Sequence, residues 1–213
     1  MNKILVVDDH TIVRHGLVRI LSEMDGGFEI DEASNGQEAL MMFNSSDYSL
    51  VLLDISMPGR NGLEILKCIK RDKPMVPVLM LSMHSERQYA VRALRLGAAG
   101  YLTKESASHE LQGAVTKIIS GGKYLSPSMA ELLAESLFES KKPITDNLHE
   151  ALSDREQQLV VMMATGKTIT EVANELCLSI KTVSTYRARI LEKLNLRTSG
   201  EIIAYAIKNN LVY

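Results

Sequence analysis

Short apolar runs alternate with amphipathic segments throughout residues 1–125, and this alternation restricts the fold more than any other feature. The runs are too short for helices and lack the period-two pattern of a half-exposed strand, so each suits a strand buried on both faces of a parallel sheet. We therefore predict an α/β fold, a doubly wound (βα)5 unit with right-handed crossovers and helices on both sheet faces. The apolar runs lie at residues 4–7, 28–33, 50–53, 76–81 and 99–102.

Start and stop signals flank the amphipathic segments. Asn35 with Glu38, and Asn61 with Glu64, match helix starts at which a cap side chain and a Glu three residues later satisfy free amides. Gly97 and the glycines at 121–122 are typical of helix ends. The first amphipathic segment is expected to bury an apolar face that contains Ile12, Leu17, Ile20 and Leu21.

The strand pattern stops well before the C-terminus. Residues 126–138 predict one more helix, and the polar stretch 139–150 predicts a linker. From residue 152 four short helices are expected, with starts at Ser153, Thr168, Ser179 and Ser199. We thus predict three parts: a domain at 1–122, an extra helix and linker at 123–151, and an all-α domain at 152–213.

Composition excludes several classes of protein. Hydrophobic residues make up 46% and charged residues 23% of the 213 residues, with a formal net charge of −2, which is globular composition. Apolar runs fall far short of the roughly 20 residues that span a bilayer, and the N-terminus has no signal-peptide pattern. We expect a cytoplasmic protein that does not contact membranes. Cys68 and Cys177 show no metal-site spacing, so we expect two reduced thiols packed as small hydrophobic side chains.

Polar side chains follow four of the predicted strands. They are Asp8 with Asp9, Asp54, Ser82 and Lys104. The carboxyl ends of parallel strands share one edge of a sheet, where ligands bind. Three close carboxylates repel unless a cation neutralises them, and Mg²⁺ prefers oxygen ligands. A carboxylate can accept a phosphoryl group, whose charge the metal and a lysine would neutralise. Turn chemistry alone also places Asp at strand ends, but four such ends together favour the site.

The same residues lie in motifs that resemble the receiver domain of two-component response regulators across residues 3–122. The matching stretches are VVDDH (6–10), LLDISMPGRNG (52–62), LMLS (79–82) and GAAGYLTK (97–104). The resemblance implies that Asp54 is the phosphoacceptor and that Asp8, Asp9, Asp54 and the Ser56 carbonyl hold Mg²⁺ or another divalent cation. It also implies phosphoryl contacts from Ser82 and Lys104, and a rotamer switch at Tyr101, which from the residues alone could equally be a half-buried strand residue.

One position departs from this pattern. Many receiver domains have a proline after the lysine, often with a cis bond, whereas Glu105 stands there in this chain. A cis bond without proline costs roughly 3 kcal/mol, so the resemblance does not carry that feature over.

The helix expected at 179–195 separates into two faces. Val183, Ile190 and Leu194 form its apolar side, while small and polar side chains lie opposite. Such an outer face could enter a DNA major groove, with Ser184 and Thr185 at base edges. An ordinary helical bundle that binds another protein remains the alternative from the residues alone.

Residues 152–212 resemble the LuxR-type helix-turn-helix of NarL/FixJ response regulators. The matches are LSDRE (152–156), ATGKTITEVANELCLS (164–179), KTVSTYRARILEKLN (181–195) and AYAIKNNLV (204–212). A family position that is often basic is Ala188 here, so we rely on Ser184 and Thr185 for base contacts. The expected DNA-binding residues are Lys181, Thr182, Ser184, Thr185, Arg187, Ala188, Arg189 and Lys193.

The two resemblances imply a DNA-binding transcription regulator that a sensor histidine kinase phosphorylates. Phosphorylation is expected to promote a homodimer on double-stranded DNA, with RNA polymerase as a further partner. One alternative is a regulator whose receiver site is unused. Another is a phosphatase, but such enzymes carry a second Asp two residues after the nucleophile, where this chain has Ser56. We therefore expect no enzyme activity beyond slow loss of its own phosphoryl group.

Overall fold

The computed structural model describes residues 2–25, 27–83, 86–139, 151–209 and 211. It divides into two compact units, residues 1–134 and 135–213, and each is described by itself. Among the described residues, no helix combines the length and the apolar character needed to cross a membrane.

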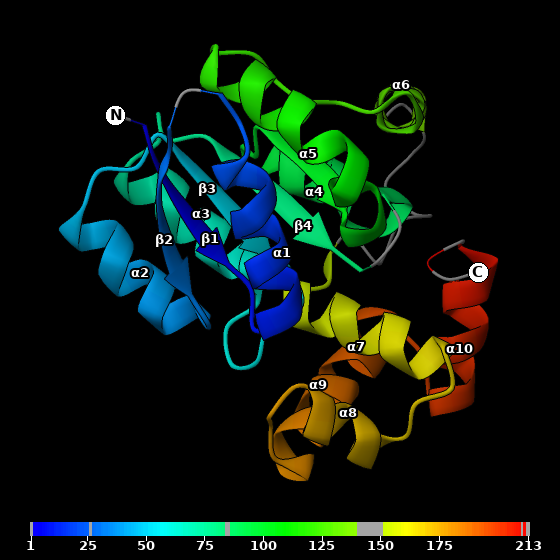
Figure 1. Ribbon diagram of the computed structural model, residues 1–213. Helices are drawn as coiled ribbons and strands as arrows, with labels where there is room; N and C mark the ends of the chain where they lie inside the picture. The colour runs from blue at the N-terminus through cyan, green and yellow to red at the C-terminus, as the bar shows by residue number, and fades with distance from the viewer. Residues whose placement is uncertain (1, 26, 84–85, 140–150, 210, 212–213) are drawn as a thin grey trace. The chain divides into compact units, whose positions relative to one another are not determined.

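The first unit is built on a five-stranded parallel sheet (Figure 1) with strand order β2-β1-β3-β4-β5. This is the doubly wound (βα)5 arrangement that the sequence predicts. The elements are β1 Lys3–Val7, α1 Thr11–Ser22, β2 Glu29–Ala33, α2 Gly36–Ser45, β3 Leu50–Asp54, α3 Gly62–Asp72, β4 Val78–Ser82, α4 Glu86–Arg95, β5 Gly100–Thr103 and α5 Lys104–Ile119.

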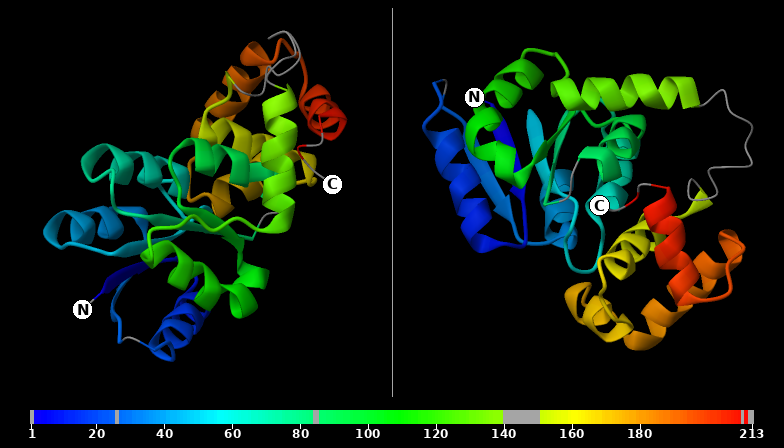
Figure 2. Two further views of the ribbon diagram at one scale, coloured as in Figure 1. Left: turned by 90° about the horizontal axis from the view of Figure 1, so that it is seen from above. Right: turned by 90° about the vertical axis from the view of Figure 1, so that its right-hand side faces the viewer.

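Helices cover both faces of the sheet, with α1 and α5 on one side and α2, α3 and α4 on the other (Figure 2). Alternate residues of β1 enter the two cores: Leu5 packs in the cluster beneath α2 to α4, and Ile4 in the cluster beneath α1 and α5. All five residues of β3, and all five of β4, are buried. The continuous apolar runs therefore reflect burial on both faces, as expected of a parallel sheet.

Helix α2 begins at the predicted Asn35 cap, but its Glu38 bonds to a different residue from the one expected. Asn35 caps α2 by accepting from the Gln37 and Glu38 amides. The Glu38 carboxylate binds Ser34 instead of closing the predicted box on Asn35.

Ile12 is 88% exposed, so its expected place on the buried face of α1 is wrong. Val13 in the same turn packs against the core, whereas Ile12 lies about 140° around the helix axis from the buried Leu17.

The segment after α5 packs on the first unit. The Tyr124 amide donates to the Ala99 carbonyl at 2.9 Å, and Met129 is buried in the core. The extra helix is present as α6, Pro127–Glu139. The predicted linker spans residues 139–150, and residues 140–150 lie outside the described residues.

The second unit holds the four predicted helices α7 Asp154–Ala164, α8 Ile169–Glu175, α9 Ile180–Lys193 and α10 Ser199–Lys208. Capping boxes at Ser153 and Thr168 open the first two, and Ser179 caps α9. Thr198, not the expected Ser199, caps α10. Cys177 is exposed at a positive φ of 52° in the turn before α9, so its predicted packing as a buried thiol is wrong.

Gly62 gives a test of how closely α3 approaches the end of β3. A Cβ at this position would lie 2.1 Å from the Asp54 carbonyl oxygen, so Gly62→Ala is expected to destabilise the first unit by roughly 2–3 kcal/mol. Gly113→Ala in α5 meets open space and should stabilise by about 1 kcal/mol, because alanine is the better helix former. Urea unfolding of both variants measures the difference, and equal effects would contradict the close approach.

Candidate functional site

Four strand ends bring the predicted polar side chains to one edge of the sheet. Asp54 ends β3 beside Leu81 of β4, and Ser82 ends β4 beside Thr103 of β5. Asp8 follows β1, and its amide donates to the Ala33 carbonyl at the end of β2. Asp8, Asp54 and Ser82 are fully buried. Residues far apart in the sequence thus form a single polar group at the carboxyl edge.

Lys104 lies between two of the carboxylates. Its Nζ is 2.7 Å from Asp8 Oδ2 and 2.9 Å from Asp54 Oδ2, and its side chain is only 4% exposed. Lys104 begins α5, whose N-terminus is capped by the Thr103 hydroxyl accepting from the Ser106 amide. The described residues contain no cis peptide bond, so the bond between Lys104 and Glu105 is trans.

Burial and neighbouring charges both shift the pKa values of Asp54 and Lys104. Burial raises the pKa of Asp54, Lys104 opposes the rise, and the Asp8 carboxylate adds to it, so that the pKa of Asp54 reaches about 6. Burial lowers the pKa of Lys104, but the two carboxylates outweigh burial and its pKa is raised. At neutral pH the group therefore holds two carboxylates and one ammonium, a net negative charge.

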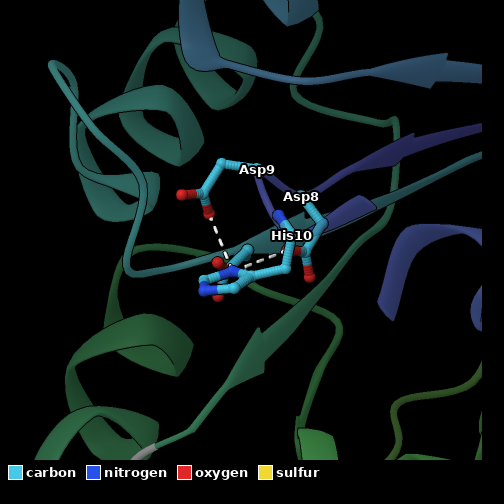
Figure 3. Close-up of side chains that lie close together, drawn as sticks. Asp8, Asp9 and His10 are labelled. Carbon is cyan, nitrogen blue, oxygen red and sulfur yellow. Dashed lines mark hydrogen bonds and ion pairs between the residues drawn. The ribbon is translucent and has the colours of Figure 1, made fainter. Parts of the chain in front are cut away.

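The turn between β1 and α1 adds a third carboxylate and an imidazole (Figure 3). The His10 Nδ1 lies 3.1 Å from Asp9 Oδ1 and 3.3 Å from Asp8 Oδ1, and the His10 amide donates to Asp8 Oδ1. Ligand atoms from Asp8, Asp9, His10 and Asp54 all lie within 4.8 Å of one another. In the sequence His10 stands out only as the last residue of the VVDDH motif, because its contact with both carboxylates depends on the turn geometry.

These donors suit a hard divalent cation. Carboxylate oxygens are the ligands that Mg²⁺ prefers, and the excess negative charge of the group favours a cation. Asp9 is partly exposed and so can meet an ion that keeps several waters. Ser56 lies beside the group, since its amide faces Asp54 Oδ1 at 3.3 Å. Its hydroxyl is buried with no hydrogen-bond partner among the described residues.

Tyr101 lies in β5 and is fully buried. Its neighbour in the register is Met80 of β4, two residues before Ser82. The structure thus places it in the strand that adjoins the Ser82 strand, and it is not half-exposed. Its role as a rotamer switch stays a prediction.

In the second unit, α9 presents the expected outer face to solvent. Val183 and Ile190 are buried in the core of this unit. The exposed residues on its other side include Lys181, Ser184, Thr185, Ala188, Arg189 and Glu192. Thr182 lies at the start of the helix, where its amide and hydroxyl meet the Ser179 hydroxyl.

Two basic residues expected to contact DNA, Arg187 and Lys193, bind residues outside α9 in the second unit. Arg187 Nε donates to Ser199 Oγ at 2.6 Å. Lys193 Nζ lies 2.6 Å from Glu156 Oε2 and donates to the Ala151 carbonyl at 3.1 Å. Burial raises the pKa of Glu156, but Lys193 and Ser153 more than offset it and the pKa is lowered. Sequence reasoning missed these structural contacts because helical periodicity does not reveal partners on other helices.

Each of the two units matches a known protein family. Residues 4–116 match the response regulator receiver domain, and residues 150–206 match the LuxR family of bacterial regulatory proteins.

Similar proteins span nearly the whole chain. The response regulator GacA of Pseudomonas protegens is 37% identical over 212 residues, covering 100% of this chain and 98% of its own. The response regulator UvrY of Escherichia coli K12 is also 37% identical, covering 99% and 96%. Among solved structures, RcsB of Salmonella enterica serovar Typhimurium, bound to the promoter rprA with phosphomimetic BeF3⁻, is 25% identical with a TM-score of 0.64, covering 96% of this chain and 98% of RcsB.

The raised pKa of Asp54 leads to a stability prediction. Its folded pKa of about 6 exceeds the unfolded value of about 3.9, so the buried carboxylate destabilises the fold above pH 6, and this cost disappears as the pH falls toward 4. With metal chelated, Asp54→Asn should therefore stabilise the first unit by roughly 2–3 kcal/mol near pH 7.5 and by little near pH 4. Urea unfolding of the wild type and Asp54→Asn across this pH range measures the difference between their free energies of unfolding.

Asp47→Asn is the matched control. Lys73 lowers the pKa of the exposed Asp47, so this variant should not gain stability as the pH rises. An Asp54→Asn gap that stays constant from pH 4 to pH 7.5 would contradict the prediction.

Proposed function

The chain belongs to the response regulators that carry a LuxR-type DNA-binding domain, and on this premise we propose that phosphorylation of Asp54 switches its binding to DNA. The observation that carries the proposal is the buried Asp54 carboxylate held by Lys104 beside Asp8. A histidine kinase is the phosphoryl donor, and the protein acts in the cytoplasm, where its DNA lies.

Asp54 supplies the nucleophile. An oxygen of its carboxylate forms a P–O bond as the P–N bond to the kinase histidine breaks, and the imidazole leaves with the electron pair of that bond. Because desolvation raises the pKa of Asp54 only to about 6, the reactive carboxylate form predominates at neutral pH. The transferred group carries negative charge into a buried site, so its stabilisation depends on the cations around it.

Lys104 is positioned to neutralise that charge. Its ammonium already contacts Asp54 Oδ2, and it can shift from the carboxylate to a phosphoryl oxygen without leaving the site. Ser82 ends the neighbouring strand β4 and is the hydroxyl that we assign to another phosphoryl oxygen. Both residues thus act on the product of the transfer.

A divalent cation, Mg²⁺ in our proposal, would be held by Asp8, Asp9 and Asp54 together with the Ser56 carbonyl. When bound, it neutralises the carboxylates and the phosphoryl oxygens during transfer. Its fit rests on the oxygen donors and the net negative charge described above.

The signal passes along the strands that end at the site. A phosphoryl oxygen that draws Ser82 inward would vacate space near the end of β4, and Tyr101 on the adjoining strand could fill it. We assign to this change the formation of a homodimer, which places two α9 helices on DNA half-sites about one turn apart. RNA polymerase is the partner that would read such a complex.

The site does not favour turnover of a free substrate. Ser56 occupies the position at which phosphatases with an aspartate nucleophile carry a general acid, and a serine hydroxyl does not serve in that role near neutral pH. The protein is thus proposed to be a regulator whose only hydrolysis is the slow loss of its own phosphoryl group.

DNA contact is proposed for α9. Ser184 and Thr185 lie on its exposed face and suit base edges, while Lys181 and Arg189 suit phosphates. Arg187 and Lys193 also form contacts within the second unit, through Nε to Ser199 and through Nζ to Glu156.

Phosphorylation of the whole chain tests the receiver assignment. With acetyl phosphate and Mg²⁺, the wild type should gain one hydroxylamine-labile phosphoryl group by intact mass spectrometry, and Asp54→Asn should gain none. Asp47→Asn, which alters an exposed carboxylate, should behave as the wild type. Equal labelling of the Asp54 variant would place the phosphoryl group elsewhere, and an unlabelled wild type would favour a regulator with an unused receiver site.

Variants of α9 test the DNA contacts on a duplex that the wild type selects from a random pool. Lys181→Ala should weaken binding to selected and scrambled duplexes alike and reduce the salt slope by about 1, because a phosphate contact carries no sequence information. Ser184→Ala with Thr185→Ala should instead lose roughly 1–3 kcal/mol on the selected duplex only. Lys208→Ala in α10 is the control, and titration by fluorescence anisotropy at several salt concentrations is the measurement.

A further inference from the structure

Arg14 of α1 forms a fork between two neighbouring segments. Its Nη1 donates to the Asp8 carbonyl oxygen at 2.7 Å, and its Nε donates to Glu32 Oε2 at 3.0 Å. The Arg14 side chain is only 13% exposed, so this geometry is held by the surrounding protein. Glu32 belongs to β2, which places the fork between the strand next to β1 and the turn that carries the acidic pair.

With this fork, every polar group of Asp8 has a partner. Its amide donates to the Ala33 carbonyl at 3.2 Å, and its carbonyl accepts from Arg14. Its carboxylate meets His10 on one oxygen and Lys104 on the other. Two main-chain bonds and two side-chain contacts therefore define the direction in which the turn leaves β1.

Arg14 cannot itself touch the ion or the phosphoryl group through these bonds. Both of its described donors are directed at Asp8 O and Glu32, and the bond to Asp8 is to the main chain rather than to a carboxylate oxygen. Pairing with Glu32 also balances its charge, so its influence on Asp54 through the electrostatic field is small compared with its geometric effect.

From this geometry we propose that Arg14 is a positioning residue of the phosphoacceptor site. It fixes the turn so that the Asp8 and Asp9 carboxylates keep the spacing that a divalent cation requires beside Asp54. The inference rests on the proposed function of this site and names a residue that neither motif matching nor strand-end reasoning selects. Metal affinity typically falls by about 10–100-fold when a group that orients a metal ligand, without contacting the ion itself, is removed.

The same helix offers a matched control. Arg19 also donates its Nε to a glutamate, Glu23, at 3.0 Å, but it is 83% exposed and has no described contact with the turn. Arg19→Met removes the same side chain and the same type of ion pair from α1. Any effect of Arg14→Met beyond that of Arg19→Met then belongs to the contact with Asp8 or to the buried position of Arg14.

Two further variants separate geometry from charge and from folding. Arg14→Lys retains the positive charge but cannot reach Asp8 O and Glu32 with the planar fork. Glu32→Gln retains an acceptor for Nε and removes only its charge. Thermal unfolding of each variant establishes that the chain is folded under the conditions of the binding measurements.

The experiment titrates the full chain with Mg²⁺ by calorimetry and then measures labelling by acetyl phosphate as a function of Mg²⁺ concentration. Arg14→Met should raise the Mg²⁺ dissociation constant about 10-fold, Arg14→Lys should give an intermediate value, and Glu32→Gln and Arg19→Met should change it less than 3-fold. Saturating Mg²⁺ should return the labelling rate of Arg14→Met to near that of the wild type.

An unchanged Mg²⁺ affinity in folded Arg14→Met would overturn the inference, as would full recovery in Arg14→Lys, which would make charge alone sufficient. If Arg14→Met does not fold, Arg14→Lys decides, and wild-type affinity in that variant has the same meaning. Failure of the proposed function is distinguishable, because the wild type itself would then neither bind Mg²⁺ nor accept a phosphoryl group.

Discussion

The buried ion pairs of Lys104 are the contact on which the site depends. The Lys104 ammonium lies within 3 Å of Asp8, which follows β1, and of Asp54, which ends β3, and Lys104 is the first residue of α5. Without it, two carboxylates would be buried side by side with no compensating charge, at a cost of several kcal/mol. These ion pairs therefore link three parts of the chain at the edge of the sheet. They offset part of the rise that burial causes in the pKa of Asp54, which still reaches about 6.

The turn between β1 and α1 is organised around this charge. Asp8 faces Lys104 on one side and His10 on the other, while its main chain is held by Ala33 and Arg14. A receiver site is thus more than its acidic residues, because their directions depend on groups that never meet the ligand. Such supporting contacts explain why an arginine in the first turn of α1 can matter for chemistry at the strand ends.

In the second unit, the residues that hold α9 in the core differ from those that can contact DNA. Val183 and Ile190 hold α9 in the core, and Lys193 binds Glu156 at the start of α7. Ser184 and Thr185 remain exposed. Helix α9 is therefore anchored near its C-terminal end by an ion pair, while the small side chains of Ser184 and Thr185 stay on its exposed face.

Sequence patterns alone predicted the alternation of five strands and five helices in the first unit, the four helices of the second unit and the polar residues at the strand ends. They succeeded there because apolar periodicity and capping side chains act locally, within a few residues. They failed at the level of single side chains, because the pattern gives no exposure or bond partner for each residue: Ile12 is exposed, Glu38 binds Ser34, and Cys177 lies on the surface.

The sequence by itself determined which side chains stand at the ends of the strands, since those positions follow from the lengths of the apolar runs. Only the tertiary structure decided how they meet. The 2.7 Å and 2.9 Å contacts of Lys104, the fork of Arg14 and the bond between Lys193 and Glu156 join residues 6 to 96 positions apart. Such contacts depend on the packing of whole elements, which brings distant parts of the chain together and leaves no local pattern in the sequence.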